Sequence, residues 1–341
     1  MDLILKFMKK EFVIGIDVSK EKLDICLLKH GSSEALEERV IKNNHSEIEK
    51  YLERVCKKVD KSKLVVCLEH TGYYGLTLCV VMQKLEIDFT LVPALEIKNT
   101  QGITRGKTDK VDALRIAMYA WRYLDKLKPT VLPGEELLLC KELLALRDQN
   151  VKMSVQLQNS LKSHSIVSSL LNNTVVVDRI KKQIVELKKE IEEIEKQLEE
   201  LINTSENLKI NFNLLKSIKG IGQITALVLI ITTQNFQSFR DGRKYSSYAG
   251  LAPFRHESGK MNKGSRVSNL ANKKIKTLLH NGACTAINCD PELKLYYKRK
   301  TEEGKAKLSV LNAGACKLLY RVFAIINRQT PYVNLYQNNF A

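Results

Sequence analysis

Four acidic residues have the types and positions that metal-dependent chemistry requires. Asp109 and Asp112 stand three apart in "KTDKVDALRIA", at the expected start of a helix, where positions i and i+3 point to nearly the same side. Asp17 ends the apolar run "FVIGID", and Glu69 ends the run "KLVVCLE". Carboxylates crowded at one point repel each other unless cations lie between them, and Mg²⁺ prefers oxygen ligands. Two Mg²⁺ ions held by these four acids would provide the clamp used in phosphoryl transfer.

Each of these acids also has an ordinary explanation. Asp109 and Asp112 could be first-turn acids that the helix dipole favours, with Thr108 as the N-cap. Asp17 or Glu69, taken alone, could be an acid in a turn or on the surface. The joint pattern of four acids at the ends of expected elements favours the metal site.

The elements that must position these acids follow a regular order over residues 1–125. Three β-rich runs come first, then a helix, a strand, a helix, a strand and the acid-bearing helix. The segments are "FVIGIDVS", "LDICLLKH", "LEERVIKN", "SEIEKYLERVCKK", "KLVVCLEH", "YYGLTLCVVMQKLE" and "DFTLVPA". This order is the ribonuclease H-like arrangement, in which carboxylates at strand ends face an acid-bearing helix. The sequence therefore predicts an α/β metal-binding domain here.

The segment 126–208 is expected to be a helical linker followed by a coiled coil. Apolar residues recur there with alternating spacings of four and three, and Glu and Lys fill the flanks. The seam consists of Ile180, Ile184, Leu187, Ile191, Ile194, Leu198 and Leu201. Its partner is either the preceding helix, folded back as a hairpin, or the same helix in another subunit. We expect a role in assembling a homo-oligomer, a dimer or a tetramer.

The segment 209–341 is expected to be mainly helical, and it carries nearly all the charge. It has 22 Lys and Arg against 6 Asp and Glu, whereas the whole chain has a formal net charge of +17. Such a charge favours binding to a polyanion, and no amphipathic helix with a basic face and aromatic anchors favours a membrane instead. The turn "LLKSIKGIGQITALVLI" has the form of a helix-hairpin-helix, whose glycines let backbone N–H groups approach phosphates, although a plain helical turn fits as well.

The remaining composition favours a soluble cytoplasmic protein. Eight scattered cysteines with no C-x-x-C pair and no Cys/His zinc spacing are expected to be reduced core residues. The N-terminus lacks the apolar run of a signal peptide, and the longest apolar run, "ITALVLIITT", is too short to cross a membrane.

On these motifs the sequence resembles the DEDD-type insertion-sequence transposases, a family that includes the Piv-type DNA invertases. The resemblance covers nearly the whole chain and rests on "GIDVSKEKLDICLL", "CLEHTGYYG", "KTDKVDALRIA", "YAGLAPFRHESGKMNKG" and the closing region from "DPELKLYYKRK" onward. It implies an N-terminal RuvC-like domain that holds the metals, a coiled coil, and a transposase domain that contributes a serine nucleophile. It also implies a structured non-coding RNA, the bridge RNA, which pairs with target and donor DNA.

Carried over by motif, the nucleophile is Ser258 in "HESGK". Arg255, Lys260 and Lys263 stand where they could hold the scissile phosphate, and either His256 or the metal site could activate the serine. Further expected nucleic-acid contacts are Lys107, Lys219, Arg266 and Lys276.

The chain departs from the family pattern after the serine motif. Ala271 stands in a glycine-like place and Ile275-Lys276 replaces a Leu-Arg pair, so a bidentate phosphate contact is lost while the charge is kept. The departure bears on how DNA is held and not on the catalytic residues.

The sequence thus predicts an RNA-guided DNA transposase or recombinase that uses Mg²⁺ and forms a covalent serine-DNA link. Two alternatives remain. One is a RuvC-like, structure-specific nuclease that hydrolyses DNA with activated water and needs no serine. The other is a nucleic-acid-binding scaffold without catalysis, against which the intact set of four acids argues.

Overall fold

The computed structural model describes residue 7 and residues 9–32, 34–70, 72–100, 109–258 and 261–333, without the side chains of 256–258 and 261–263. Lys107 and Lys260, two of the expected phosphate contacts, therefore lie outside the described residues. The chain forms two compact units, residues 1–132 and 133–341. The boundaries that the sequence suggested at 125 and 208 stay a prediction.

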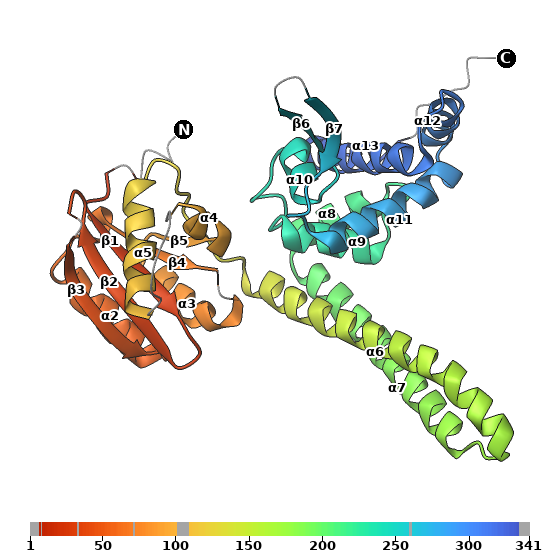
Figure 1. The fold of residues 1–341 in the computed structure, drawn as a ribbon, viewed down its shortest axis with the longest axis horizontal. Coiled ribbons are helices and arrows are strands. Elements are labelled where there is room, and N and C mark those ends of the chain that lie inside the picture. The colour runs from red at the N-terminus through yellow and green to blue at the C-terminus, as the bar shows by residue number, and fades with distance from the viewer. Residues whose placement is uncertain are drawn as a thin grey trace. The chain divides into compact units, whose positions relative to one another are not determined.

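The first unit is built on a five-stranded sheet with the order β3-β2-β1-β4-β5 (Figure 1). β1, β2 and β3 form an antiparallel meander, and β4 and β5 run parallel to β1. The strands are β1 Phe12–Val18, β2 Lys22–Lys29, β3 Ala35–Lys42, β4 Leu64–Glu69 and β5 Phe89–Val92. The helices are α2 His45–Cys56, α3 Leu76–Lys84, α4 Ala94–Asn99 and α5 Asp109–Arg122, with short 3₁₀ turns at Lys61–Lys63 and Gly72–Gly75. The order confirms the expected ribonuclease H-like arrangement.

Both faces of this sheet are buried, because successive residues of a strand point to opposite sides. In β1, Ile14 and Ile16 pack in the cluster that includes α2 and α3. Val13 of the same strand packs in a second cluster with Ala113 and Ile116 of α5. α5 thus covers one face and α2 and α3 cover the other, as Figure 1 shows.

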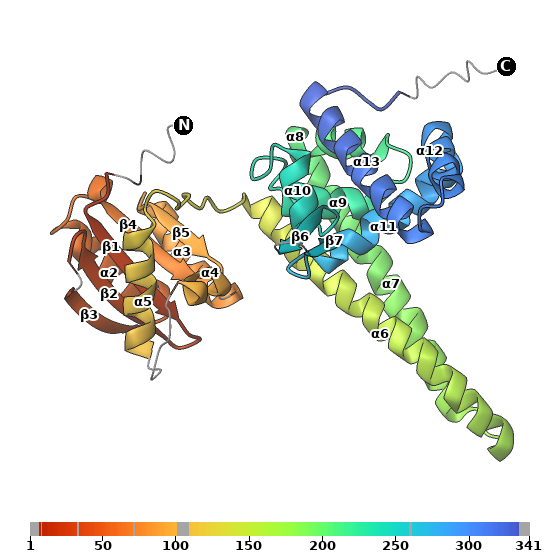
Figure 2. The same cartoon turned by 45° about the horizontal axis from the view of Figure 1, so that its top comes forward.

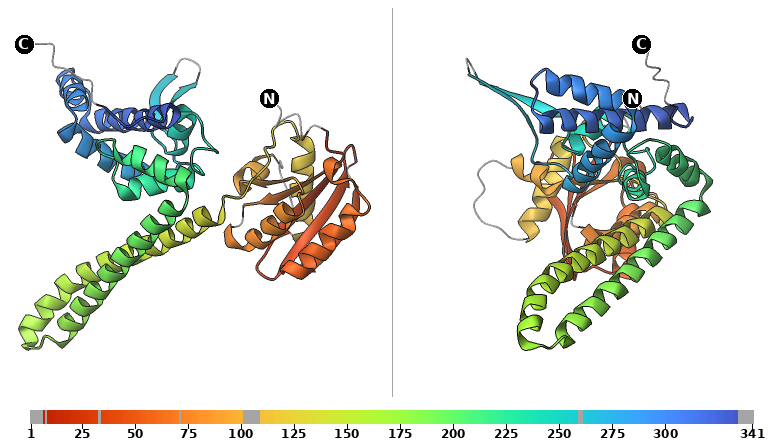
Figure 3. Two further views of the ribbon diagram at one scale, coloured as in Figure 1. Left: turned by 180° about the vertical axis from the view of Figure 1, so that it is seen from behind. Right: turned by 90° about the vertical axis from the view of Figure 1, so that its right-hand side faces the viewer.

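The second unit begins with two long helices that form a hairpin. α6 spans Glu135–Leu171 and α7 spans Val175–Thr204, and the two run side by side in both views of Figure 3. α6 ends at Asn172, whose φ of 49° is the left-handed conformation that closes many helices. Within the chain, the preceding helix packs against α7, and Ile184, Ile194 and Leu198 of the heptad seam are buried. A role of the seam in joining subunits stays a prediction.

Where the structure describes it, the rest of the second unit is helical apart from one β-hairpin. Its helices are α8 Glu206–Lys216, α9 Gln223–Thr232, α10 Gly242–Tyr248, α11 Lys273–Cys289, α12 Pro291–Glu302 and α13 Lys307–Arg328. The hairpin consists of β6 Pro253–Ser258 and β7 Met261–Val267. The expectation of a mainly helical region is confirmed, and the hairpin is an element that the sequence interpretation missed.

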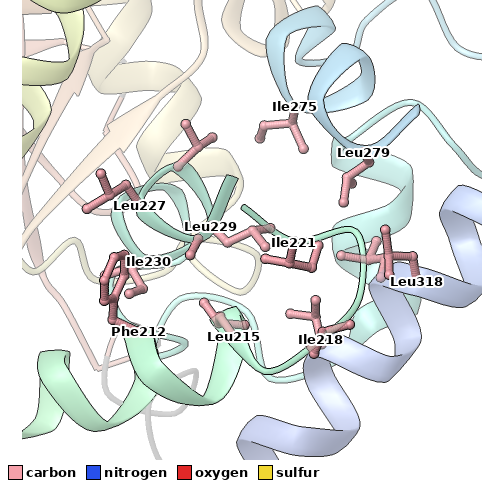
Figure 4. Close-up of a cluster of buried hydrophobic side chains, with 14 of the residues drawn as sticks. Phe212, Leu215, Ile218, Ile221, Leu227, Leu229, Ile230, Ile275, Leu279 and Leu318 are labelled. Atoms are coloured by element: carbon pink, nitrogen blue, oxygen red, sulfur yellow. The ribbon is translucent and has the colours of Figure 1, made fainter. Parts of the chain in front are cut away.

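One hydrophobic core joins these helices to the base of the α6–α7 hairpin. In Figure 4, Phe212 and Leu215 of α8, Leu229 of α9, Leu279 of α11 and Leu318 of α13 gather around one point. By length and composition α13 could cross a membrane, but half of its apolar window is buried inside the unit. Its apolar face thus serves as part of the core.

The cysteines follow the expectation in part. All eight are free, and Cys26, Cys67, Cys79 and Cys140 are buried. The two cysteines of the second half of α11, residues 284 and 289, are exposed, so they are not core residues.

Candidate active site

The parallel pairing of β1 and β4 places Asp17 and Glu69 at the same edge of the sheet. Ile16 is aligned with Leu68, so the next residues of the two strands stand side by side. Asp17 points to the same side of β1 as Val13, and Glu69 points to the same side of β4 as Cys67. Val13 and Cys67 both pack in the cluster that includes α5. Both acids therefore lie on the face that α5 covers.

α5 brings the other two predicted acids to this face. Asp109 and Asp112 stand in its first turn. The helix lies so close to β1 that a Cβ built on Gly15 would be 2.3 Å from the carbonyl oxygen of Ala113. Only glycine at position 15 permits this approach, so the strand residue two before Asp17 sets the distance between the strand acid and the helix acids.

The electrostatics of Asp17 show that all four acids share one region. Its pKa is raised from 3.8 to about 6, first by burial and then by the negative charges of Asp112, Asp109, Asp24 and Glu69. A carboxyl whose ionisation is opposed by four others lies in a strongly negative potential. The structure thus brings the four predicted acids within electrostatic range of one another.

Asp24 is a fifth acid of this site, and the sequence interpretation missed it. It is the direct partner of Asp17 across the β1–β2 pair, and only 3% of it is exposed. The signal available in the sequence was an acid that interrupts the apolar strand "LDICLL" at a position facing α5. Hairpin register would have placed it beside Asp17.

Two basic side chains partly neutralise these acids. Lys22 Nζ lies 2.7 Å from Asp109 Oδ2 and 3.0 Å from Asp24 Oδ2, and these hydrogen-bonded partners raise the pKa of Lys22. Arg115 Nη1 lies 2.8 Å from Asp112 Oδ1, one helical turn away. Five carboxylates against these two cations leave a formal charge of −3 at one edge of the sheet.

The donor set suits a hard divalent cation, because all five acids offer carboxylate oxygens in a negative potential. In the part of the chain that the structure describes, no three His, Cys, Asp or Glu side chains are already arranged to hold a metal ion. Lys22 and Arg115 hold Asp109 and Asp112 in ion pairs instead. The metal-ligand roles of the four predicted acids stay a prediction.

The second predicted catalytic segment is the β6–β7 hairpin. Ser258 is the last residue of β6, and its backbone pairs with Met261 at the start of β7. Its side chain and that of Lys263 are outside the description, so the nucleophile stays a prediction. A strand end beside a two-residue connection presents a residue at the tip of the hairpin.

The other predicted phosphate contacts fall at three places in the second unit. Arg255 and Arg266 are exposed on β6 and β7, and because Arg255 pairs with Ser265, the two arginines lie on opposite faces of the ribbon. Lys219 is exposed in the turn between α8 and α9. Lys276 is half-buried on α11.

Two glycines near these lysines have packing roles. A Cβ on Gly220 would be 2.3 Å from the carbonyl oxygen of Gly282, and its φ of 94° favours glycine, so the turn before α9 is closed by contact with α11. A Cβ on Gly250 would be 2.5 Å from Cβ of Ala271. The close approach of Ala271 therefore requires glycine at position 250, whose φ of 68° also favours glycine.

Comparisons with known proteins find transposases and a related DNA-inverting protein. Residues 14–165 match a family described as "Transposase", of the DEDD type, and residues 212–298 match the "Transposase IS116/IS110/IS902 family". The chain is 27% identical over 330 residues to the pilin gene-inverting protein of Moraxella lacunata, covering 94% of this chain and 97% of that protein. It is 24% identical over 274 residues to the transposase for insertion sequence element IS1533 of Leptospira borgpetersenii, covering 73% and 77%.

Among solved structures, RuvC of T. thermophilus in complex with a Holliday junction substrate matches at 14% identity and a TM-score of 0.29, covering 35% of this chain and 99% of that one.

A ribonuclease H-like unit with acids at the ends of β1 and β4, joined to a helical transposase region, defines the class of DNA-cleaving transposases and recombinases. Within this class, the chain belongs to the IS116/IS110/IS902 family of insertion-sequence transposases. Enzymes of this DEDD type use divalent metal ions and act on DNA.

Proposed function

We propose that this transposase is guided by a non-coding RNA and exchanges DNA strands through a covalent link between Ser258 and DNA. Asp17, Glu69, Asp109 and Asp112 would hold Mg²⁺. When bound, Mg²⁺ would help to deprotonate the attacking hydroxyl and stabilise the leaving oxygen. The observation that carries the proposal is the gathering of four carboxylates around Asp17 of β1, one each from β2 and β4 and two from the first turn of α5.

The serine step conserves the phosphodiester bond. The Ser258 hydroxyl oxygen attacks phosphorus, the bond from phosphorus to one deoxyribose oxygen breaks, and the released hydroxyl takes a proton. The energy of the broken bond is kept in the new serine-phosphate ester, so a second DNA end can reverse the step and be joined. His256 or the metal site would accept the serine proton, and Arg255 would offset charge on the phosphate.

The fourth acid of the site, Asp112, has a positioning partner that the structure adds. Arg115 holds its carboxylate from one helical turn further along α5, at 2.8 Å. A carboxylate held in this way keeps one oxygen directed by the arginine while the other remains able to bind a cation. We propose that Arg115 orients Asp112 for metal binding.

The partners follow from the same proposal. DNA, both target and donor, and a guide RNA would bind Lys107 of the first unit and the basic residues of the second. The contacts there would include Lys219, Lys260, Lys263, Arg266 and Lys276. Because the acids and the serine stand in different units, both units must act on the same phosphate. We propose that a cytoplasmic homo-oligomer allows the serine of one subunit to meet the acids of another.

The experiment uses the full chain with its RNA and DNA. Wild-type protein should yield a protein-DNA adduct that survives denaturation, and Ser258→Ala should bind DNA but yield no adduct. Mixing Ser258→Ala with Asp17→Asn protein should restore part of the activity if the sites are shared between subunits. Cleavage by Ser258→Ala at the normal rate, with free DNA ends, would instead support a hydrolytic RuvC-like nuclease. Absence of any metal-dependent cleavage by the wild type would support a non-catalytic scaffold.

A further inference from the structure

An open hollow of about 460 Å³ is lined by residues of α10, of the two positions before it, and of α13. The two helices pack against each other (Figure 2). None of its residues belongs to the acid site or to the serine hairpin. Its lining is Arg240, Arg243, Tyr320, Phe323, Ala324 and Asn327, together with Asp241 and Gly242. The volume falls in the range of small-molecule sites, roughly 300–1,000 Å³.

Two arginines provide the charge of this hollow. Arg240 and Arg243 are exposed, and neither guanidinium has an acidic partner within 4.0 Å among the residues that the structure describes. Asp241 between them is occupied otherwise, because its Oδ1 accepts a hydrogen bond of 2.8 Å from the backbone N–H of Arg243. The two guanidinium groups and the Asp241 carboxylate give the lining a formal charge of +1. Guanidinium groups match phosphate oxygens well.

An aromatic ring distinguishes this hollow from a simple anion site. Tyr320 is 43% exposed, and no ring of the described residues stacks on it. Gly242 lets α10 approach the rings of α13, since a Cβ there would be 3.0 Å from Cδ1 of Tyr320 and 3.3 Å from Cδ2 of the buried Phe323. The lining of the hollow thus includes two aromatic rings, of which Phe323 is buried and Tyr320 is exposed.

Three residues of α13 that line the hollow lie on one face of the helix, so one ligand could contact all of them. Tyr320, Ala324 and Asn327 stand at positions i, i+4 and i+7, which share one face of a helix, and all three are exposed. Asn327 brings an amide that both donates and accepts hydrogen bonds, as the edge of a nucleobase requires. One ring, one amide and two cations therefore border the same open volume.

We infer that this hollow binds one unpaired nucleotide of a single-stranded nucleic acid. The base stacks on the ring of Tyr320 and lies next to the small side chain of Ala324, while Asn327 forms hydrogen bonds with the edge of the base. Arg240 and Arg243 bind the adjoining phosphates. A duplex fits less well, because its bases are already stacked on one another and cannot reach the ring. The inference rests on the chain acting on nucleic acids and is independent of the serine step.

The test measures binding of a short fluorescent oligothymidylate to the full chain by fluorescence anisotropy. Three other ligands are compared with it: the matching RNA strand, a duplex of the same length, and a strand of the same length without bases. Stacking on aromatic side chains contributes enough that Tyr320→Ala should weaken single-strand binding about tenfold, while Tyr320→Phe should keep it. The wild type should bind the abasic strand about tenfold more weakly, and Tyr320→Ala should no longer distinguish the two strands.

A charge-matched control separates the arginines from the general basic surface. Arg240→Ala with Arg243→Ala should reduce the slope of log affinity against log salt by about 1.4, the effect of losing two single-strand phosphate contacts. The control pair, Lys298→Ala with Arg299→Ala on α12, removes two positive charges whose side chains form ion pairs. This pair should leave the ratio of the affinities for the normal and the abasic strand unchanged. The assay measures binding and no cleavage, so its result is independent of the proposed catalysis.

Three results would overturn the inference: unchanged single-strand affinity in Tyr320→Ala, an equal loss for the normal and abasic strands, or an equal loss for the single strand and the duplex. Tighter binding of the DNA or of the RNA strand would support the inference and identify which of the two supplies the nucleotide.

Discussion

Asp17→Asn should make the cation-free protein more stable while abolishing DNA cleavage. In the fold, the pKa of Asp17 is raised from 3.8 to about 6 by burial and by its acidic neighbours. One pKa unit corresponds to about 1.4 kcal/mol, so a shift of about two units gives at most ~3 kcal/mol. Asp17 is partly exposed, and solvent screening reduces the expected gain to about 1–2 kcal/mol.

The gain depends on pH with a definite sign. The folded Asp17 binds its proton more tightly than the unfolded chain does, so stability decreases as pH rises from about 4 through about 6. Above about pH 6, Asp17 is ionised in the folded protein, and the full loss of stability caused by its charge is present. Asn has the same shape and no charge, so it removes this loss. The advantage of Asp17→Asn should therefore be largest at pH 7 and shrink toward pH 4.

The assay is thermal unfolding of the full chain in a metal chelator, followed at pH 7 and at pH 4. A gain of 1–2 kcal/mol raises the midpoint of a unit of this size by roughly 3–8 °C. Added Mg²⁺ should raise the midpoint of the wild type more than that of the variant, because the variant has lost a ligand. Asp125→Asn, which removes an exposed acid from the same unit, is the matched control and should leave the midpoint unchanged.

The reasoning fails if Asp17→Asn unfolds at the same or a lower temperature than the wild type at pH 7 in the chelator. Equal shifts at pH 7 and pH 4 would also contradict it, because a pH-independent effect would come from packing. Strand exchange by Asp17→Asn at the normal rate would separate the acid site from catalysis altogether.

Three further changes test the scaffold of the two units. Gly15→Ala should cost about 3 kcal/mol or more, because the new Cβ would be 2.3 Å from a carbonyl oxygen of α5, and thermal unfolding checks this. Leu198→Ala should cost about 3 kcal/mol in urea unfolding, since Leu198 is fully buried where α7 packs into the core. Arg321→Met should cost about 3 kcal/mol, because it leaves the buried carboxylate of Asp290 without its cation at 2.9 Å. Burial opposes ionisation of Asp290, but hydrogen bonds and the arginine lower its pKa, so the stabilisation is present above about pH 4 and lost as pH falls through that lowered pKa.

Each of these three has an outcome that contradicts it. An unchanged midpoint for Gly15→Ala would mean that α5 can move away from β1 at no cost. A cost below 1 kcal/mol for Leu198→Ala would show that the hairpin base is not part of the core. For Arg321→Met, a loss of stability that is the same at pH 3 and pH 7 would assign the effect to packing instead of charge.

Much of the first unit could be predicted because its signals are local. Period-two apolar runs mark strands and the 3.6 period marks helices, and each such pattern is decided within about ten residues. The order of these elements then determined that Asp17 and Glu69 would end parallel strands. The first-turn position of Asp109 and Asp112 was equally local, since it depends only on where α5 begins.

Other features depend on which residues meet across the fold. Asp24 and Lys22 join the acid site only because the β1–β2 register places Asp24 opposite Asp17, and register is a property of two strands. The β6–β7 hairpin was missed because "FRHESGKMNKGSRV" is mostly polar and has no apolar alternation to mark its strands. The hollow at Tyr320 is built from residues nearly eighty positions apart.

The sequence by itself determined the elements of the first unit, the basic character of the second, and the four acids and the serine motif as candidates, because these depend on residue type and local spacing. The tertiary structure alone decided which cations hold those acids, that the α7 seam packs against α6 of the same chain, and that an unstacked ring lies beside two arginines. These features depend on distances between residues remote in the chain, and such distances follow from how the elements pack.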